Sequence, residues 1–155
     1  MFDAPIEDWY VWLGVAAISV AVLAVAVSLP SAAPPKATAV ADAVDRVATS
    51  PPGSTATHSI RAAAMKLDQT RVSLRGAGGR AHAAIAYGPV VSVQTGGQLD
   101  SVLQGTDPGT VFETPAALDR AAELAQDRTP TWQPAPETIR IRRVNWEGGD
   151  VVLVG

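Results

Sequence analysis

The most prominent hydrophobic pattern in the chain is an uncharged apolar run over residues 11–29. At about 1.5 Å per residue, an α-helix of this length spans roughly 28 Å, close to the hydrocarbon thickness of a bilayer. Trp9, Tyr10 and Trp12 lie at the start of the run, where aromatic rings prefer the membrane interface. The pattern predicts a transmembrane helix at 11–29, preceded by an acidic N-terminal tail at 1–10.

Two other interpretations of this run are weaker. A helix buried in a small core usually has a polar face, whereas the only polar side chains here are Ser19 and Ser28. A cleaved secretory signal has a basic start and a shorter apolar stretch, but here the start is acidic and Pro34 directly follows the small residues 31–33. We therefore expect an uncleaved anchor and a single-pass protein of the cell membrane.

Small residues recur along one stripe of this helix with a spacing of three and four. They are Gly14, Ala17, Ala21, Ala24 and Ser28. A groove of small residues lets another helix approach closely, so these are the predicted helix-packing residues. The predicted partners are accordingly the lipid bilayer and other membrane proteins. An alanine-rich helix can also produce such a stripe by chance.

The remainder of the chain predicts a linker and a folded head. Residues 30–37 are rich in proline and predict a stiff connection, after which a soluble α+β head domain is expected over 38–155. At the start of the head, Val40, Val44 and Val47 recur at helical spacing, which predicts a short amphipathic helix.

The head alternates between strand-like and helical patterns. Alternating apolar residues at 71–75 and 81–87 flank the glycine-rich residues 76–79, which predicts a β-hairpin. Residues 98–103 predict one or two helical turns, and Thr114-Pro115 is typical of a helix start.

The C-terminal segment predicts two strands. Ile139 and Ile141 have one parity and Val144 and Trp146 have the other, so the apolar phase changes at residues 142–143 and indicates a β-bulge there. The predicted fold class is α+β: an N-terminal transmembrane helix, a short amphipathic helix, then a small, mostly antiparallel β-sheet head with one or two short helices.

Charge and composition exclude several classes of function. The net charge is −3, and from Lys36 onward the acidic and basic residues balance, which disfavours nucleic-acid binding. The chain contains no cysteine, so disulfides and thiolate metal sites are excluded. His58 and His82 have no partner at a metal-ligand spacing, and residues 76–79 lack the Lys of a phosphate-binding loop. We predict no catalytic, metal-binding or cofactor-binding residues, no cofactor, no small-molecule substrate and no enzymatic activity.

One dense basic cluster is a candidate for partner contact. It consists of Arg140, Arg142 and Arg143. Such a cluster can bind an anionic headgroup or an acidic protein. The alternative is an edge strand whose charges prevent pairing with other chains.

Several segments carry a resemblance to a known family. They are residues 1–5 leading into Trp9–Gly14, then Val72–Arg75, the glycine turn, Ala84–Val90 and Gly149–Val154. In these the chain resembles a haloarchaeal family of small, uncharacterised, single-pass membrane proteins. The resemblance implies association with type IV pilus-like (Tad-type) systems, as a pilin-like or accessory component.

Two functional hypotheses follow. The preferred one is a membrane-anchored structural or accessory component of a type IV pilus-like assembly, with its head outside the cytoplasm and acting through protein–protein contacts. The accessory role is favoured over the filament subunit because no basic residue precedes the helix and Asn145 forms no glycosylation sequon. The alternative is a cytoplasm-facing membrane adaptor or regulator, because Lys36 and Arg46 follow the helix and basic residues favour the cytoplasmic side.

Overall fold

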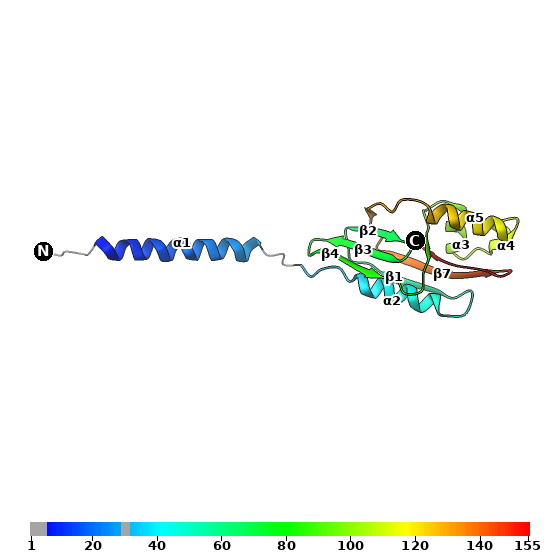
Figure 1. Ribbon diagram of the computed structural model, residues 1–155, viewed down its shortest axis with the longest axis horizontal. Coiled ribbons are helices and arrows are strands. Elements are labelled where there is room, and N and C mark those ends of the chain that lie inside the picture. The colour runs from blue at the N-terminus through cyan, green and yellow to red at the C-terminus, as the bar shows by residue number, and fades with distance from the viewer. Residues whose placement is uncertain (1–5, 29–31) are drawn as a thin grey trace. The chain divides into compact units, whose positions relative to one another are not determined.

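The computed structural model describes residues 6–28 and 32–155, with side chains of the first helix described for 9–24 (Figure 1). The chain divides into two compact units, Met1–Ser31 and Ala32–Gly155. The N-terminal unit contains one helix, α1 (Ile6–Ser28). We refer to Ala32–Gly155 as the C-terminal unit.

The predicted transmembrane helix is not supported. Crossing a bilayer takes about 20 consecutive, mainly apolar residues in one helix. Within the described ranges, no helix has the length and apolarity that a membrane span requires. The predicted span at 11–29, the single-pass placement in the cell membrane and the extracytoplasmic head are therefore wrong. Leu29, the last residue of that span, lies outside the described residues.

The C-terminal unit is an α+β fold with two four-stranded sheets, whereas the sequence predicted one sheet. Sheet A has the order β1-β7-β8-β5 and sheet B the order β4-β3-β2-β6. The elements are α2 (Ala37–Ala48), β1 (Thr55–Ser59), β2 (Ala64–Asp68), β3 (Arg71–Gly76), β4 (Gly79–Ala84), β5 (Val90–Ser92), α3 (Gln98–Leu103), α4 (Pro108–Val111), α5 (Pro115–Gln126), β6 (Gln133–Pro134), β7 (Thr138–Trp146) and β8 (Gly149–Val154). All strand pairs are antiparallel except β5 with β8.

Helix α2 forms where the amphipathic pattern predicted it. Val40, Val44 and Val47 lie on one buried face, which contacts strands of both sheets. These valines join Leu74 from sheet B and Ile141 from sheet A in a single core. We call this the α2 core; it holds the two sheets together.

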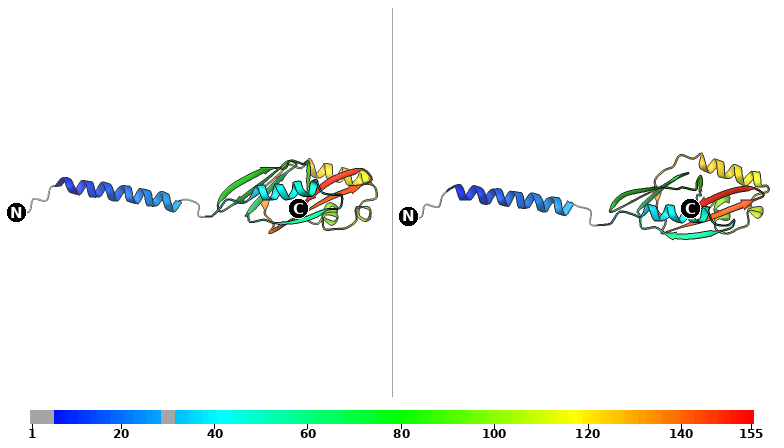
Figure 2. Two further views of the ribbon diagram at one scale, coloured as in Figure 1. Left: turned by 90° about the horizontal axis from the view of Figure 1, so that it is seen from below. Right: turned by 60° about the horizontal axis from the view of Figure 1, so that its bottom comes forward.

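Sheet A has a second core on its opposite face. There, Leu153 and Val144 pack against Leu103 and Leu118 from the helices α3 and α5. Figure 2 shows strands β7 and β8, in orange and red, between α2 in cyan and the yellow helix α5. We call this the α5 core. Sheet A is therefore buried on both faces.

The two cores explain the phase change in β7 without a bulge. Ile139 and Ile141 point into the α2 core, whereas Val144 and Trp146 belong to the α5 core. The pairing of β7 with β8 is continuous from Ile141 to Trp146. The predicted bulge at residues 142–143 is therefore wrong, because the change of parity is a change of the face that is buried.

The predicted hairpin and the two predicted C-terminal strands both contain tight turns. Strands β3 and β4 are paired up to Gly76 and Gly79, so the glycine-rich turn is confirmed. Strands β7 and β8 are joined through Glu147 and Gly148, which both have positive φ (47° and 97°). Two consecutive residues with positive φ are typical of a type I′ hairpin turn.

The short helices α3, α4 and α5 exceed the one or two predicted. The predicted helix start at Thr114 is confirmed, since its hydroxyl accepts a hydrogen bond from the Ala117 N–H at 3.2 Å. Helix α4 begins after Asp107, whose carboxylate accepts a hydrogen bond from the Gly109 N–H at 2.8 Å.

Candidate functional site

The two histidines lie on different sheets. His58 is on β1 of sheet A and His82 is on β4 of sheet B. Among the residues that the structure describes, no group of three or more His, Cys, Asp or Glu side chains could hold a metal ion.

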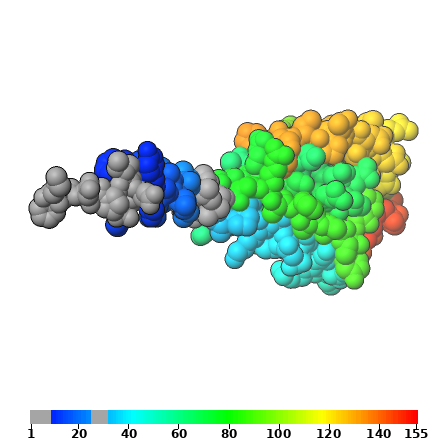
Figure 3. All heavy atoms as spheres, turned by 60° about the vertical axis from the view of Figure 1, so that its left-hand side comes forward, coloured from blue at the N-terminus to red at the C-terminus, as the bar shows by residue number. Residues whose placement is uncertain are grey.

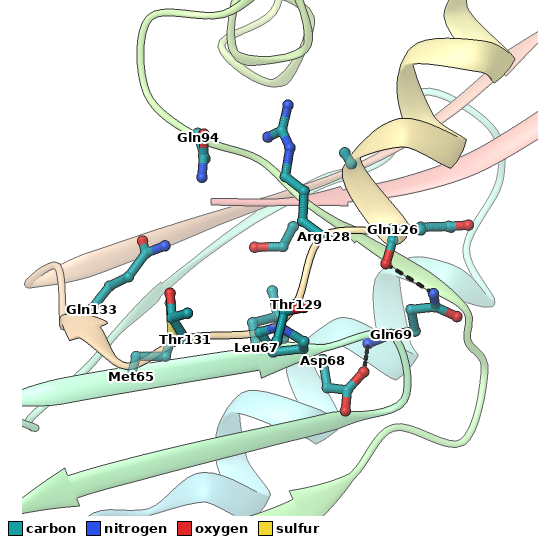
Figure 4. A pocket seen from close by; sticks show the side chains of 13 residues that line it. Met65, Leu67, Asp68, Gln69, Gln94, Gln126, Arg128, Thr129, Thr131 and Gln133 are labelled. Carbon is teal, nitrogen blue, oxygen red and sulfur yellow. Dashed lines mark hydrogen bonds between the residues drawn. The ribbon is translucent and has the colours of Figure 1, made fainter.

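A small cavity lies where β2 meets the segment after α5 (Figure 4). Its volume is about 70 Å³, well below the roughly 300–1,000 Å³ of typical small-molecule pockets. Amide groups dominate its hydrogen bonding: the side-chain N–H of Gln69 donates to the Gln126 carbonyl at 3.1 Å. Asp68 accepts from the backbone N–H of Gln69 at 2.7 Å, so its carboxylate serves the turn beside the cavity. These contacts are structural.

The arginines of β7 do not gather on one surface. Arg140 and Arg142 point towards α3, and Arg143 points to the opposite side of sheet A, as the alternation of the strand requires. Strand β7 lies between β1 and β8, so the alternative interpretation as a charged edge strand is wrong.

Arg140 and Arg142 stabilise the end of helix α3. Arg142 donates from one Nη1 to the carbonyls of Val102 and of Thr106, the latter at 3.0 Å. Arg140 donates to the carbonyl of Gln104 at 3.2 Å. Cationic side chains at a helix C-terminus satisfy free carbonyls and complement the helix dipole. The structure thus gives these arginines an internal role, and their contact with a partner stays a prediction.

Arg143 forms an ion pair across the β7–β8 hairpin. Its guanidinium contacts the carboxylate of Asp150 and also donates to the Ser50 carbonyl at 2.6 Å. The hydrogen bond from Arg143 lowers the pKa of Asp150 below its usual value. The pair therefore links the hairpin to the loop that follows α2.

The apolar surface of α1 is the first candidate interaction surface. The helix exposes large side chains on every side, including Trp9 (66 %), Trp12 (73 %) and Leu23 (64 %). Four of the predicted packing residues, Gly14, Ala17, Ala21 and Ala24, are exposed as well. Ser28 belongs to α1, but its side chain lies outside the described ones. An exposed apolar surface of this extent is typical of a contact site.

A cationic surface on sheet B is the second candidate, and sequence reasoning missed it. Lys66, Arg75 and Arg80 come from three neighbouring strands and surround the ring of Trp132. Arg75 alternates with the buried residues of β3, so its side chain lies on the outer side of the hairpin. No pattern in the sequence connects Trp132 to that hairpin, because the contact joins residues far apart in the chain.

The candidate sites among the described residues are therefore contact surfaces. One lies on the α+β C-terminal unit and the other on the apolar helix α1. The chain belongs to the family of unknown function DUF7283, which it matches over residues 3–144. No curated protein and no solved structure matches it. The family description gives no activity or partner, so the association with pilus-like systems stays a prediction.

Proposed function

We propose that the protein is a non-catalytic structural or accessory component of a protein assembly, which it joins through contacts of α1 with other helices. The observation that carries this proposal is the exposed apolar surface of α1. From Trp9 to Ala24, every described side chain of the helix is exposed.

The exposed apolar side chains of α1 are stabilised when another structural element buries them. Each apolar side chain that leaves water contributes about 25 cal/mol per Å² of buried area. The amphipathic helix α2 obtains this contribution from one face inside its own unit. Helix α1 has no polar face between Trp9 and Ala24, where Ser19 donates its hydroxyl to the Val15 carbonyl at 2.8 Å. A helix that is apolar on all sides is normally buried by other elements.

The covering element that we propose is helix α1 of a second copy. Gly14, Ala17, Ala21 and Ala24 leave a shallow groove on the helix, and the large side chains beside it supply matching ridges. Two such helices can approach closely at the groove and bury the ridges on either side. Both surfaces are present in the same chain, so no further component is needed for this contact.

The particular assembly that we propose is type IV pilus-like, on the basis of the sequence resemblance. The proposal does not include the membrane anchor that the sequence predicted. The alternative, an adaptor or regulator with no catalytic activity, stays a prediction without its placement at the membrane.

The test measures self-association of the full chain by sedimentation velocity over a range of concentrations. The double variant Ala17→Leu/Ala21→Leu fills the groove and is expected to raise the dissociation constant by about tenfold or more, because overpacking keeps the helices apart. The substitution makes α1 more apolar, so weaker association could not come from lost hydrophobicity.

The matched control is Ala16→Leu. Ala16 adjoins Ala17 in sequence but lies on a different side of the helix, at about 100° per residue. We expect its dissociation constant to stay within about twofold of the wild type. A chain that is monomeric at every concentration would refute the contact, and equal weakening by groove and control variants would refute the role of the groove.

A further inference from the structure

The outer side of sheet B collects positive charge. Strand pairing places Arg75 directly opposite Arg80, and Lys66 opposite Ser73, which itself lies opposite His82. Residues opposite each other in a sheet point to the same side. We use the term cationic face for these side chains together with the neighbouring Arg71 and the ring of Trp132. Figure 3 shows the green strands of this region at the surface beside the orange segment before β7.

Trp132 holds the charges of this face together. The Cζ of Arg75 lies 5.1 Å from the centre of its ring, the Nζ of Lys66 5.7 Å and the Cζ of Arg80 6.0 Å. Like charges opposite each other destabilise a sheet, and an aromatic ring offsets part of that repulsion through cation–π attraction. The arrangement keeps three cations within reach of one bound group.

The positive charge of the face is not neutralised locally. Its only acidic residue is Asp68, whereas the residues from Lys36 onward are neutral as a whole. In the part of the chain that the structure describes, the one ion pair is Arg143 with Asp150, on sheet A. The face is therefore positive and the rest of the C-terminal unit is negative, a distribution that attracts anionic partners to one side.

We infer that the cationic face binds an extended acidic segment of a partner protein. The segment would lie across strands β4, β3 and β2 and place carboxylates beside Arg80, Arg75 and Lys66, the cations that surround Trp132. This inference rests on the proposed protein-binding, non-catalytic role and adds the chemistry of a partner. It concerns a surface separate from α1, so either contact can fail in a test while the other persists.

A polypeptide fits this surface better than a nucleic acid. A nucleic acid longer than the face would extend over the negative remainder of the unit, and charges within about 10 Å repel at physiological salt. Recognition of single strands commonly uses bases stacked on aromatic rings, but here three cations already surround the ring of Trp132.

The test measures binding of the full chain to fluorescent peptides by anisotropy. The probe is a peptide of about ten residues in which glutamate and threonine alternate, and the comparison probes are the lysine–threonine peptide and a deoxythymidine oligonucleotide of equal length. We expect saturable binding of the acidic peptide that weakens as salt rises from about 50 to about 300 mM. We expect the dissociation constant of the oligonucleotide to be at least about tenfold higher than that of the acidic peptide.

Two double variants locate the site. Arg75→Gln/Arg80→Gln is expected to weaken acidic-peptide binding by about tenfold or more. Arg46→Gln/Arg120→Gln removes the same charge from exposed positions on α2 and α5 and is expected to change it by less than about twofold. A third double variant, Arg75→Lys/Arg80→Lys, retains the charge and should retain most of the binding, whatever the stability of the glutamine variant.

Three results would overturn the inference. One is the absence of acidic-peptide binding to the wild type, and another is equal weakening by the face and control variants. The third is tighter binding of the oligonucleotide than of the acidic peptide, which would assign the face to nucleic acid. None of these substitutions lies in α1, so self-association can be measured on the same samples and scored separately.

Discussion

Helices α1 and α2 contain similar residues but place them differently. In α2, Val40, Val44 and Val47 share one face, and each is at most 3 % exposed. In α1, Leu13 and Val15 are two residues apart and so lie on opposite sides of the helix, and they are 51 % and 52 % exposed. The same residue types therefore stabilise the fold in one helix and remain available for contacts in the other. The position of apolar residues, more than their number, separates a core helix from a contact helix.

The substitution that breaks this comparison most strongly is Val44→Asp. Val44 is fully buried in the α2 core, so a charge there has no water and no partner. We expect the free energy of unfolding of the C-terminal unit to fall by about 4 kcal/mol or more, which would abolish its cooperative transition in calorimetry.

The control is Ile18→Asp in α1, which introduces the same charge at an exposed position. The calorimetric transition of the C-terminal unit should keep its midpoint, because α1 belongs to the other unit. A transition lost equally in both variants would show that α1 contributes to the fold, contrary to the comparison.

A second substitution extends the comparison to polar side chains that support the fold. Arg142→Met removes the donor to the Val102 and Thr106 carbonyls, but it also removes Arg142 Nε, a buried nitrogen without a partner. These two effects oppose each other, so we expect the free energy of unfolding, measured with denaturant, to fall by about 1–2 kcal/mol. Arg140→Met removes a single, exposed hydrogen bond, so the free energy of unfolding should fall by about 0.5 kcal/mol or less. Equal costs would contradict the internal role of Arg142.

The polar side of α2 provides a smaller effect. The Asp45 carboxylate accepts hydrogen bonds from the backbone N–H groups of Ala86 (3.1 Å) and Tyr87 (2.9 Å), which fixes the segment after β4. Asp45→Ala is expected to cost about 1 kcal/mol in denaturant unfolding. Asp42→Ala, at an exposed position of the same helix, serves as the control and should be nearly neutral. No difference between the two would show that the bonds to the segment after β4 contribute little.

The smallest expected effect depends on pH. The Arg143 guanidinium lowers the pKa of Asp150, so the folded state favours the charged carboxylate. This contribution is complete above the ordinary pKa of aspartate, about 3.9, and is lost as the pH falls through the lowered value. The melting temperature of Asp150→Asn should therefore lie slightly below that of the wild type near pH 7. The gap should begin to close as the pH falls below about 4 and should vanish below the lowered pKa of Asp150, whereas a constant gap would contradict the role of the ion pair.

The sequence predicted local structure better than the arrangement of its elements. The spacing of Val40, Val44 and Val47 was enough to predict α2, and the glycines at 76–79 were enough to predict the turn between β3 and β4. These features depend on neighbours within a few residues. The phase change in β7 was seen but misinterpreted, because its cause is the second core formed by α3 and α5.

Two aspects of the candidate sites show why the rest could not be predicted. Arg140, Arg142 and Arg143 are adjacent in sequence, yet strand alternation separates them onto two sides of sheet A. Trp132 and Arg75 are distant in sequence, yet they are in contact. Residues adjacent in sequence therefore suggested a cluster of arginines that the fold separates. Residues distant in sequence form the surface around Trp132, which the sequence did not reveal.

The most direct test of the proposed α1 contact is disulfide cross-linking between copies. The chain contains no cysteine, so a single introduced thiol reports only on its own position. Ala21 lies midway between Gly14 and Ser28, so two grooves that pack together would bring the two Ala21 positions close in either relative orientation. Ala16→Cys provides the control on a different side of α1. Rapid formation of a disulfide-linked dimer by Ala21→Cys, with little by Ala16→Cys, is the result that the proposal predicts. Equal cross-linking at both positions, or none at either, would contradict it.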